Sequence, residues 1–228
     1  KMTKLRICIL DVSNRTTLFE GRMTQEMFEQ AKIPCECTQF HLPSNQWPTK
    51  STNSLQEIVH TITSQFDGLV ITGSHDCCFD ETRNYHALLK QVVSELLKVN
   101  FPMLGICFGA QFIAMVVYGR EAVSTMKEKG NKPEVGVREV TLIGNDEIFE
   151  NCPKKFYTTV SHHDCFSHKD IQSLAITKQW DYHAFHVKDK KCWGIQFHPE
   201  ITGEDAKDLF QRAKELGIEN VVVSEFFM

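Results

Sequence analysis

The chain has 228 residues, of which 42% are hydrophobic and 24% are charged, and its formal net charge is -4 at pH 7. These fractions argue against the disordered, collagen-like and membrane classes of protein. The negative net charge argues against a basic surface of the kind that binds nucleic acid. A chain of this length can bury one sheet-centred core, so we expect residues 1–228 to form a single domain. From its composition and charge we expect it to bind neither nucleic acid nor a membrane.

The first predicted elements alternate between strand and helix. Continuous apolar runs at residues 5–10 and 66–73 predict buried strands. Residues 17–31 and 55–66 are compatible with helices, and prolines interrupt the chain between them. The predicted order is therefore β-α-β-α-β, with a middle strand whose bounds the pattern does not define.

The alternation continues to the middle of the chain. Residues 85–99 carry leucine and valine at helical spacing and predict an amphipathic helix. A strand is predicted at residues 102–106, followed by an apolar helix at residues 110–118 that Gly119 closes. This order predicts an α/β fold, flavodoxin-like, in which helices cover both faces of a mostly parallel sheet.

The second half is rich in strands with little helix between them, so we expect it to be partly antiparallel. The predicted strands are residues 135–143, 156–160, 173–177, 182–187 and 192–197. A last helix is predicted at about residues 204–216, with Ala206, Leu209, Phe210, Ala213 and Leu216 on one face.

The spacing of the cysteines indicates whether the chain binds a metal, and the N-terminal segment indicates its cellular compartment. The nine cysteines lack the spacing of zinc ligands, so we expect no metal site and no cofactor. The apolar run at residues 5–10 is strand-sized and carries no signal-peptide core or cleavage site. We therefore expect the protein to be cytoplasmic, located in the cytosol.

One cysteine stands between two glycines where a predicted strand meets a predicted helix, in the run Gly105-Ile106-Cys107-Phe108-Gly109. This is the context of a nucleophile elbow, a tight turn that lifts the side chain out of the sheet. The start of the following helix favours a thiolate, which is the attacking species. We therefore predict that Cys107 is a nucleophile, although a lone cysteine without these glycines would more simply be a core residue.

A histidine and a carboxylate follow the last predicted strand at its carboxyl end, where open α/β sheets carry their reactive groups. Residues two apart on an extended segment point to the same side, so Glu200 can orient His198 while His198 activates the thiol. Without Cys107, a strand-end surface histidine would be the simpler interpretation of His198.

Acyl transfer also needs hydrogen-bond donors for the oxyanion. We predict the peptide N–H of Phe108, directly after the nucleophile, as one donor. The second is predicted in the Gly73-Ser74 turn that ends the third predicted strand, although a glycine after a strand is by itself most often a turn.

Four motifs together resemble those of class I glutamine amidotransferases. They are Ile71-Thr72-Gly73-Ser74, Gly105-Ile106-Cys107-Phe108-Gly109-Ala110-Gln111, Ser161-His162-His163-Asp164 and Gly194-Ile195-Gln196-Phe197-His198-Pro199-Glu200. They occur in the family's order and span roughly residues 67–200, which is most of the chain.

The resemblance implies a catalytic triad of Cys107, His198 and Glu200 that hydrolyses a γ-glutamyl amide through a glutamyl thioester. It implies that the oxyanion rests on the N–H groups of Ser74 and Phe108. It further implies that Gln111 and the backbone around Ser161 and His162 hold the amino-acid end of a small γ-glutamyl substrate.

The turn at Ser74 departs from the family pattern, because it reads Gly-Ser-His where many members have Gly-Gly-Pro. We therefore expect strained dihedral angles at Ser74 or a different donor. Four features resemble the stand-alone, GMP-synthase-like branch that includes plant γ-glutamyl peptidases. They are the Gly-Ser turn, Phe79-Asp80, the Gly-Ile-Cys-Phe-Gly elbow and Val135-Gly136-Val137-Arg138.

Three functions stay open at this point. The first is a free-standing hydrolase of glutamine or of γ-glutamyl peptides such as glutathione. The second is an ammonia-supplying glutaminase subunit of a two-chain amidotransferase, with a separate synthetase as its partner. The third is a catalytically silent binding or regulatory member of the fold. The complete triad favours the enzymatic functions.

Overall fold

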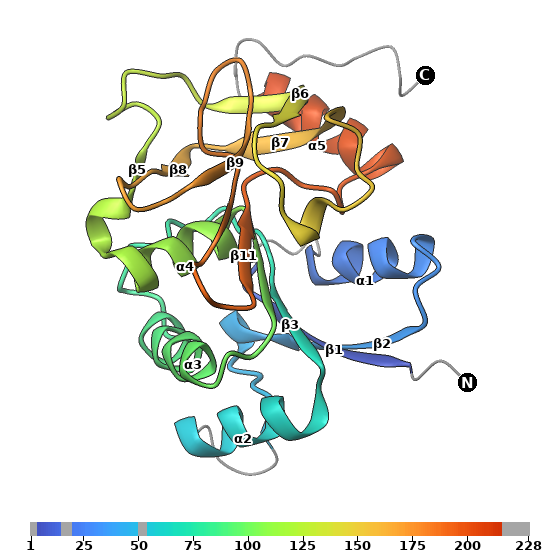
Figure 1. Ribbon diagram of the computed structural model, residues 1–228, viewed down its shortest axis with the longest axis vertical. Helices are drawn as coiled ribbons and strands as arrows, with labels where there is room; N and C mark the ends of the chain where they lie inside the picture. Colours follow the sequence, from blue (N-terminus) through green and yellow to red (C-terminus); the bar gives the residue numbers. More distant parts are fainter. Residues whose placement is uncertain (1–3, 15–19, 50–53, 216–228) are drawn as a thin grey trace.

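The computed structural model of the chain describes residues 4–14, 20–49 and 54–215 (Figure 1). Their helices and strands are β1 (Leu5–Asp11), α1 (Glu20–Gln30), β2 (Cys35–His41), α2 (Leu55–Gln65), β3 (Gly68–Ile71), α3 (His86–Lys98), β4 (Met103–Ile106), α4 (Phe108–Tyr118), β5 (Val123–Thr125), β6 (Glu134–Leu142), β7 (Lys155–His162), β8 (Asp164–Phe166), β9 (Ser173–Ile176), β10 (Ala184–His186), β11 (Cys192–Ile195) and α5 (Gly203–Glu215). Short 3-10 turns lie at Leu42–Ser44, Arg120–Ala122 and Glu147–Phe149.

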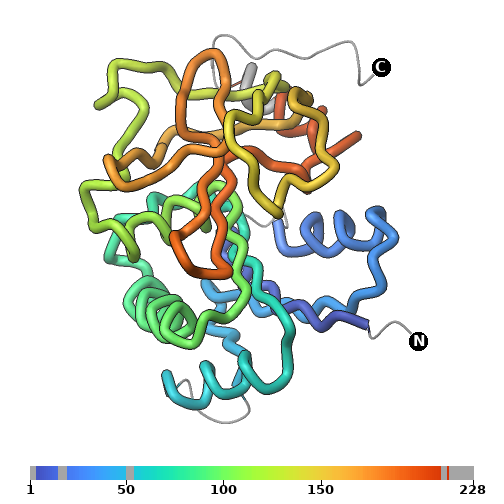
Figure 2. The backbone as a smooth tube through the Cα atoms, viewed as in Figure 1, coloured from blue at the N-terminus to red at the C-terminus, as the bar shows by residue number. Residues whose placement is uncertain are grey.

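One nine-stranded sheet organises the described residues, with its strands in the order β2-β1-β3-β4-β11-β10-β9-β6-β7. Strands β2, β1, β3, β4 and β11 pair in parallel, whereas β11, β10, β9, β6 and β7 pair antiparallel. Strands β5 and β8 form a separate two-stranded sheet. The predicted α/β class, with a mostly parallel first half and a partly antiparallel second half, is confirmed. In Figure 2 the blue-to-green first half of the backbone lies mostly below the yellow-to-red second half.

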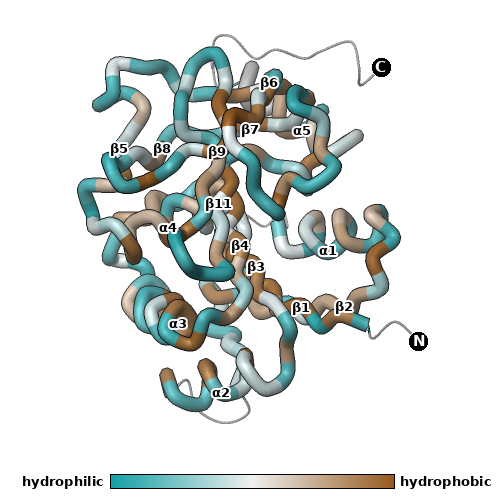
Figure 3. Tube along the Cα trace, viewed as in Figure 1, coloured by the Kyte–Doolittle hydropathy of each residue, from teal (hydrophilic) through white to brown (hydrophobic). Residues whose placement is uncertain are grey.

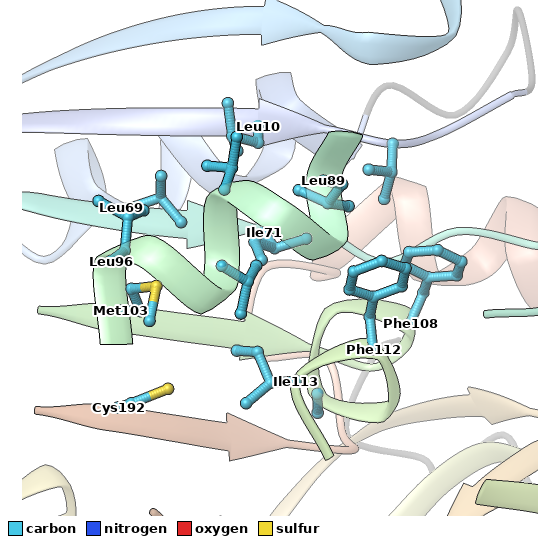
Figure 4. Close-up of a cluster of buried hydrophobic side chains, with 14 of the residues drawn as sticks. Leu10, Leu69, Ile71, Leu89, Leu96, Met103, Phe108, Phe112, Ile113 and Cys192 are labelled. Atoms are coloured by element: carbon cyan, nitrogen blue, oxygen red, sulfur yellow. The ribbon is translucent and has the colours of Figure 1, made fainter. Parts of the chain in front are cut away.

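Apolar cores cover both faces of the sheet. Each strand contributes to both cores, because its successive side chains point to opposite sides. In β1, Cys8 and Leu10 pack with α2, α3 and α4, whereas Ile7 and Ile9 pack on the other side with Phe28 of α1 and with the C-terminal strands. Apolar residues therefore concentrate along the central strands (Figure 3). Figure 4 shows the first of these cores, where Phe108 and Phe112 of α4 lie near Leu89 of α3.

The element boundaries differ from the predicted ones in a few places. Helix α4 begins at Phe108 rather than at residue 110, directly after the cysteine, and the strand predicted at residues 182–187 is confined to Ala184–His186. The middle strand of the first half is β2, and the short strands β5 and β8 had no predicted counterpart. Residues 17–19 and Leu216 of the predicted helices lie outside the described residues.

None of the helices in the described ranges is both long enough and apolar enough to span a bilayer.

The turn between β4 and α4 depends on two close backbone approaches. A Cβ atom on Gly105 would lie 2.4 Å from the carbonyl carbon of Gly109. A Cβ atom on Gly109 would lie 2.3 Å from the carbonyl oxygen of Ile71, at the end of β3. Both glycines are therefore required for helix α4 to start directly above the strand ends.

Replacing Gly105 by alanine is expected to destabilise the fold by about 2 kcal/mol or more, because backbone rather than a flexible side chain must move. The measurement is the free energy of unfolding in urea. Gly68→Ala is the control, since its Cβ would have no neighbour closer than 3.6 Å. Equal stability of the two variants would contradict this account of the turn.

Candidate active site

Cys107 occupies a sharp turn between β4 and α4. Its φ of 48° and ψ of -103° lie outside the regions that side chains with a Cβ favour. The turn is held by the N–H of Cys107, which donates to the carbonyl oxygen of Ile195 at 2.7 Å. The side chain is 4% exposed. A strained residue held by neighbouring strands is common at reactive sites, where the backbone aims a side chain.

Strand β11 brings His198 to the same edge of the sheet. It pairs in parallel with β4, Gly194 opposite Gly105 and Ile195 opposite Ile106, so the residues that follow both strands meet. The N–H of His198 donates to the carbonyl oxygen of Thr159 in β7 at 2.8 Å.

Gly73 lies against both predicted catalytic side chains. A Cβ atom on Gly73 would be 2.9 Å from Cε1 of His198 and 3.7 Å from Cβ of Cys107. The structure therefore brings the thiol and the imidazole together, and only a glycine fits beside them.

Glu200 holds the ring of His198 from behind. Its Oε1 lies 2.7 Å from Nδ1 of His198, and the side chains of His198 and Glu200 are 5% and 0% exposed. The other ring nitrogen, Nε2, is buried and has no hydrogen-bond partner among the described residues. One nitrogen is thus fixed by the carboxylate, and the other remains available for proton transfer.

The electrostatics of this group favour a charged ring. Burial alone would lower the pKa of His198, but the charges of Glu200 and Cys107 and the hydrogen bond with Glu200 raise it well above its ordinary value. The amide Nε2 of Gln196 donates to the sulfur of Cys107 at 3.4 Å. A donor and a cationic ring beside the sulfur stabilise a thiolate.

The predicted oxyanion donors lie on both sides of Cys107. Phe108 opens helix α4, and the N–H groups of a first helical turn have no partner within the helix. The turn at Gly73 and Ser74 is tied to that helix, because the N–H of Gly109 donates to the carbonyl oxygen of Thr72 at 3.2 Å.

The strained backbone expected at Ser74 is not found, because Ser74 is not among the described residues with positive φ. The serine instead closes its own turn, since its hydroxyl accepts from the N–H of Asp76 at 3.1 Å. The strain lies at Cys107, where the chain must reverse from strand to helix.

The predicted substrate residues share one cavity with the sulfur. Its lining is Ser74, His75, Asp76, Cys107, Gln111, Ser161, His162, His163 and Asp164. Gln111 is fixed in place, because its amide Nε2 donates to the carbonyl oxygen of Asp164 at 2.8 Å and to Oε1 of Gln196 at 3.2 Å.

A buried carboxylate outside the predicted site supports this cavity. Oε2 of Glu134 lies 3.1 Å from Nε2 of His162 and 2.8 Å from Nε2 of His183. Its other oxygen accepts from the hydroxyl of Thr177 at 2.8 Å. Nδ1 of His162 lies 3.0 Å from the carbonyl oxygen of Asp164, so the ring is held from two sides.

Burial would raise the pKa of Glu134, but hydrogen bonds from His162 and His183, together with their charges, lower it well below its ordinary value. Burial lowers the pKa of His183. The facing atoms of Glu134, His162 and His183 lie within 4.8 Å of one another, close enough to hold a metal ion. The same contacts are also explained as hydrogen bonds that the imidazole N–H groups donate to the carboxylate. The expectation from sequence that the chain holds no metal stays a prediction.

Sequence reasoning missed Glu134 and His183 because they are 49 residues apart and approach each other only through the sheet. A charged residue at the start of an apolar strand was the one available signal for Glu134. Gln196 was quoted within its motif, but its contact with sulfur depends on the register of β4 and β11.

Residues 45–215 match the family Glutamine amidotransferase class-I. GMP synthase [glutamine-hydrolyzing] 1 of Bacteroides thetaiotaomicron is 27% identical over 199 residues, which are 86% of this chain and 33% of that protein. The chain therefore spans about a third of the length of this curated relative.

A further relative and a solved structure cover more of their own length. A glutamine-hydrolyzing GMP synthase subunit of Picrophilus torridus is 29% identical, over 61% of this chain and 70% of that protein. The crystal structure of a glutamine amidotransferase from Thermotoga maritima superposes with a TM-score of 0.71 at 20% identity. It covers 94% of this chain and 84% of that chain, so the two share the fold.

Replacing Glu134 by glutamine is expected to lower the free energy of unfolding at pH 7 by about 3 kcal/mol, because it removes the buried charge that accepts three hydrogen bonds. Since the folded pKa of Glu134 is depressed, its contribution is present above the unfolded value of about 4.3 and is lost as the pH falls below it.

The measurement is urea unfolding of both proteins between pH 7 and pH 3. The stability difference should shrink as the pH falls below about 5, toward the range where the carboxyl becomes protonated. Exposed Glu29→Gln is the control. A difference that does not depend on pH would contradict an ionised Glu134.

Proposed function

The chain belongs to the class I glutamine amidotransferase family, and on that premise we propose that it hydrolyses the side-chain amide of glutamine, with Cys107 as the nucleophile. The observation that carries the proposal is the grouping of a strained Cys107 with a buried His198 whose Nδ1 lies 2.7 Å from Glu200. Nucleophile, base and orienting carboxylate are the parts that acyl transfer through a thioester requires.

The proposed reaction begins with attack of the Cys107 thiolate on the amide carbon. The carbonyl oxygen takes the negative charge and accepts hydrogen bonds from the N–H groups of Phe108 and of the turn at Gly73 and Ser74. His198 gives its proton to the nitrogen, the C–N bond breaks, and ammonia leaves. Cys107 then carries a glutamyl thioester.

The second half of the reaction releases glutamate. His198 takes a proton from water as the water oxygen attacks the thioester carbon. The C–S bond breaks, the thiolate re-forms beside the imidazolium, and glutamate leaves. Glu200 keeps the ring oriented through both steps, because its bond to Nδ1 leaves Nε2 facing the reacting atoms.

We propose that the cavity beside Cys107 holds the amino-acid end of the substrate. Gln111 and the backbone of Ser161 and His162 line it. The buried Glu134 fixes the ring of His162, so this segment keeps its position when the substrate binds. In this proposal Glu134 positions the site and does not touch the reacting atoms.

A second candidate is the ammonia-supplying subunit of a two-chain amidotransferase with a separate synthetase. It is favoured by one observation: the chain spans only a third of the length of its GMP synthase relative, while a shorter relative carries the name of one GMP synthase subunit. A γ-glutamyl peptidase, suggested by the Gly-Ser turn, uses the same chemistry with a larger leaving group. A silent binding protein is disfavoured because every triad position is filled.

We further propose that the protein works in the cytosol. All nine cysteines are free, including the exposed Cys152, and Cys35 and Cys37 are partly exposed. Free thiols at this frequency persist in reducing compartments, whereas oxidising compartments favour disulfides.

Cys107→Ser is expected to lower kcat/KM for glutamine at least about a thousandfold, because a hydroxyl does not ionise beside His198. Glu200→Gln is expected to lower kcat about a hundredfold or more, since the ring loses its orienting charge. Glutamate release is the measurement, and Cys152→Ser is the matched control at an exposed cysteine.

Full activity of Cys107→Ser would refute the proposed nucleophile. The same assay with glutamine, glutathione and other γ-glutamyl peptides compares leaving groups. Steady turnover of glutamine by the pure chain supports a free-standing hydrolase. Negligible turnover that rises on adding a synthetase supports the two-chain amidotransferase.

A further inference from the structure

A second cavity lies next to the loop that carries Ser74. Its lining is Glu20, Ser74, His75, Ser161, His198, Ile201 and Leu209. It shares Ser74, His75 and Ser161 with the cavity beside Cys107, but it reaches His198 and Glu20 in place of the sulfur. Both cavities therefore border the predicted reaction centre, the first at the sulfur of Cys107 and the second at His198.

The position of this second cavity matches that of a leaving group. In the proposed reaction the departing nitrogen takes its proton from His198, so it leaves on the side of the imidazole. The glutamyl portion stays attached to Cys107, in the first cavity. The space bounded by His198, Ser74 and Glu20 is therefore where the released amine would first lie.

The second cavity is small. Its volume is about 10 Å³, close to the least that one water molecule needs. Ammonia is a molecule of about that size. In this conformation the second cavity thus fits the product of glutamine hydrolysis.

Glu20 gives this cavity a specific polar group. The residue is 4% exposed, and its Oε2 has no hydrogen-bond partner among the described residues. A buried carboxyl oxygen without a donor is costly, so a donor supplied by a ligand is favoured there.

The neighbours of Glu20 set its charge. Burial is the main cause that raises the pKa of Glu20, to about 7, and the charge of Asp11 raises it further. A backbone hydrogen bond of Glu20 itself and the charge of His198 lower it. Asp11 differs from Glu20, because the hydroxyl of Ser13 and the amide of Gln39 already donate to its two oxygens.

We propose that Glu20 receives the ammonia released at Cys107 and holds it as an ammonium ion. The inference rests on the proposed glutaminase reaction. After the C–N bond breaks, ammonia takes the proton of a protonated Glu20, and the resulting ammonium ion pairs with the carboxylate. When the ammonium ion leaves, Glu20 regains a proton from solvent. The product then departs as a cation, a form suited to release into water.

The first test is inhibition of glutamine hydrolysis by ammonium chloride, with sodium chloride at equal ionic strength as reference. Glu20→Gln keeps the size of the side chain and removes its charge, so the inhibition constant for ammonium should rise at least about fivefold. Glu29→Gln, at an exposed position of the same helix, should behave as the wild type. Equal inhibition of wild type and Glu20→Gln would overturn the proposal.

The wild type provides a test that does not depend on a substitution. Ammonium should inhibit roughly tenfold more strongly at pH 8 than at pH 6, because Glu20 becomes ionised through its pKa of about 7. Asp11 and His198 act on Glu20 through their charges, and His75 is a further titratable residue in the lining of the cavity. An inhibition constant that does not depend on pH would contradict the role of Glu20.

Thermal unfolding separates this inference from the proposed function, because it needs no turnover. Ammonium chloride should raise the Tm of the wild type above that in sodium chloride, and this difference should vanish in Glu20→Gln. Stabilisation by ammonium in a chain without glutaminase activity would refute the proposed function and retain the ammonium site. Turnover of glutamine without ammonium-specific stabilisation or inhibition would refute the site alone.

Discussion

The parallel pairing of β4 with β11 is the constraint on which the candidate site depends. Gly105 opposes Gly194 in this register, so Cys107 and His198 leave the sheet at one edge although they are far apart in the chain. The bond from the N–H of Cys107 to the carbonyl oxygen of Ile195 fixes the turn to the neighbouring strand. A slip of one residue would turn the side chains of one strand to the other face and so separate the thiol from the imidazole.

The same edge concentrates unfavourable features that the surrounding structure must offset. Cys107 has a positive φ, and the side chains of His198 and Glu200 are almost fully buried. Burying an ion pair costs desolvation energy, and it is tolerated when hydrogen bonds hold the charges in place. The apolar contacts of Phe108 and its neighbours on α4 supply stability next to the strained turn (Figure 4).

Much of the fold follows from local sequence patterns. The apolar run of β1 and the leucine spacing of α3 are each enough to predict the element. The alternation of strands and helices along the first half predicts that its strands pair in parallel. Short strands such as β5 and β8 escaped prediction, because three residues carry no periodicity and form only through pairing with each other. Helix α4 starts earlier than predicted, because the elbow leaves no space between nucleophile and helix.

The residues of the candidate site also fall into two groups, those that local sequence patterns indicate and those that only the fold brings together. Its motif residues could be named from sequence, because Cys107 between glycines and His198 after a strand carry local signals, and the structure brings them together. Glu20 and Glu134 could not be named, since their environments arise from contacts between distant segments. The catalytic roles of all these residues stay predictions.

The most direct test of the central claim, that His198 activates Cys107, is the alkylation rate of Cys107 by iodoacetamide at pH 7, followed by peptide mass spectrometry. In His198→Asn this rate should fall at least about tenfold, while that of the exposed Cys152 stays unchanged. Equal rates for Cys107 in the wild type and in His198→Asn would show that the imidazole does not activate the sulfur.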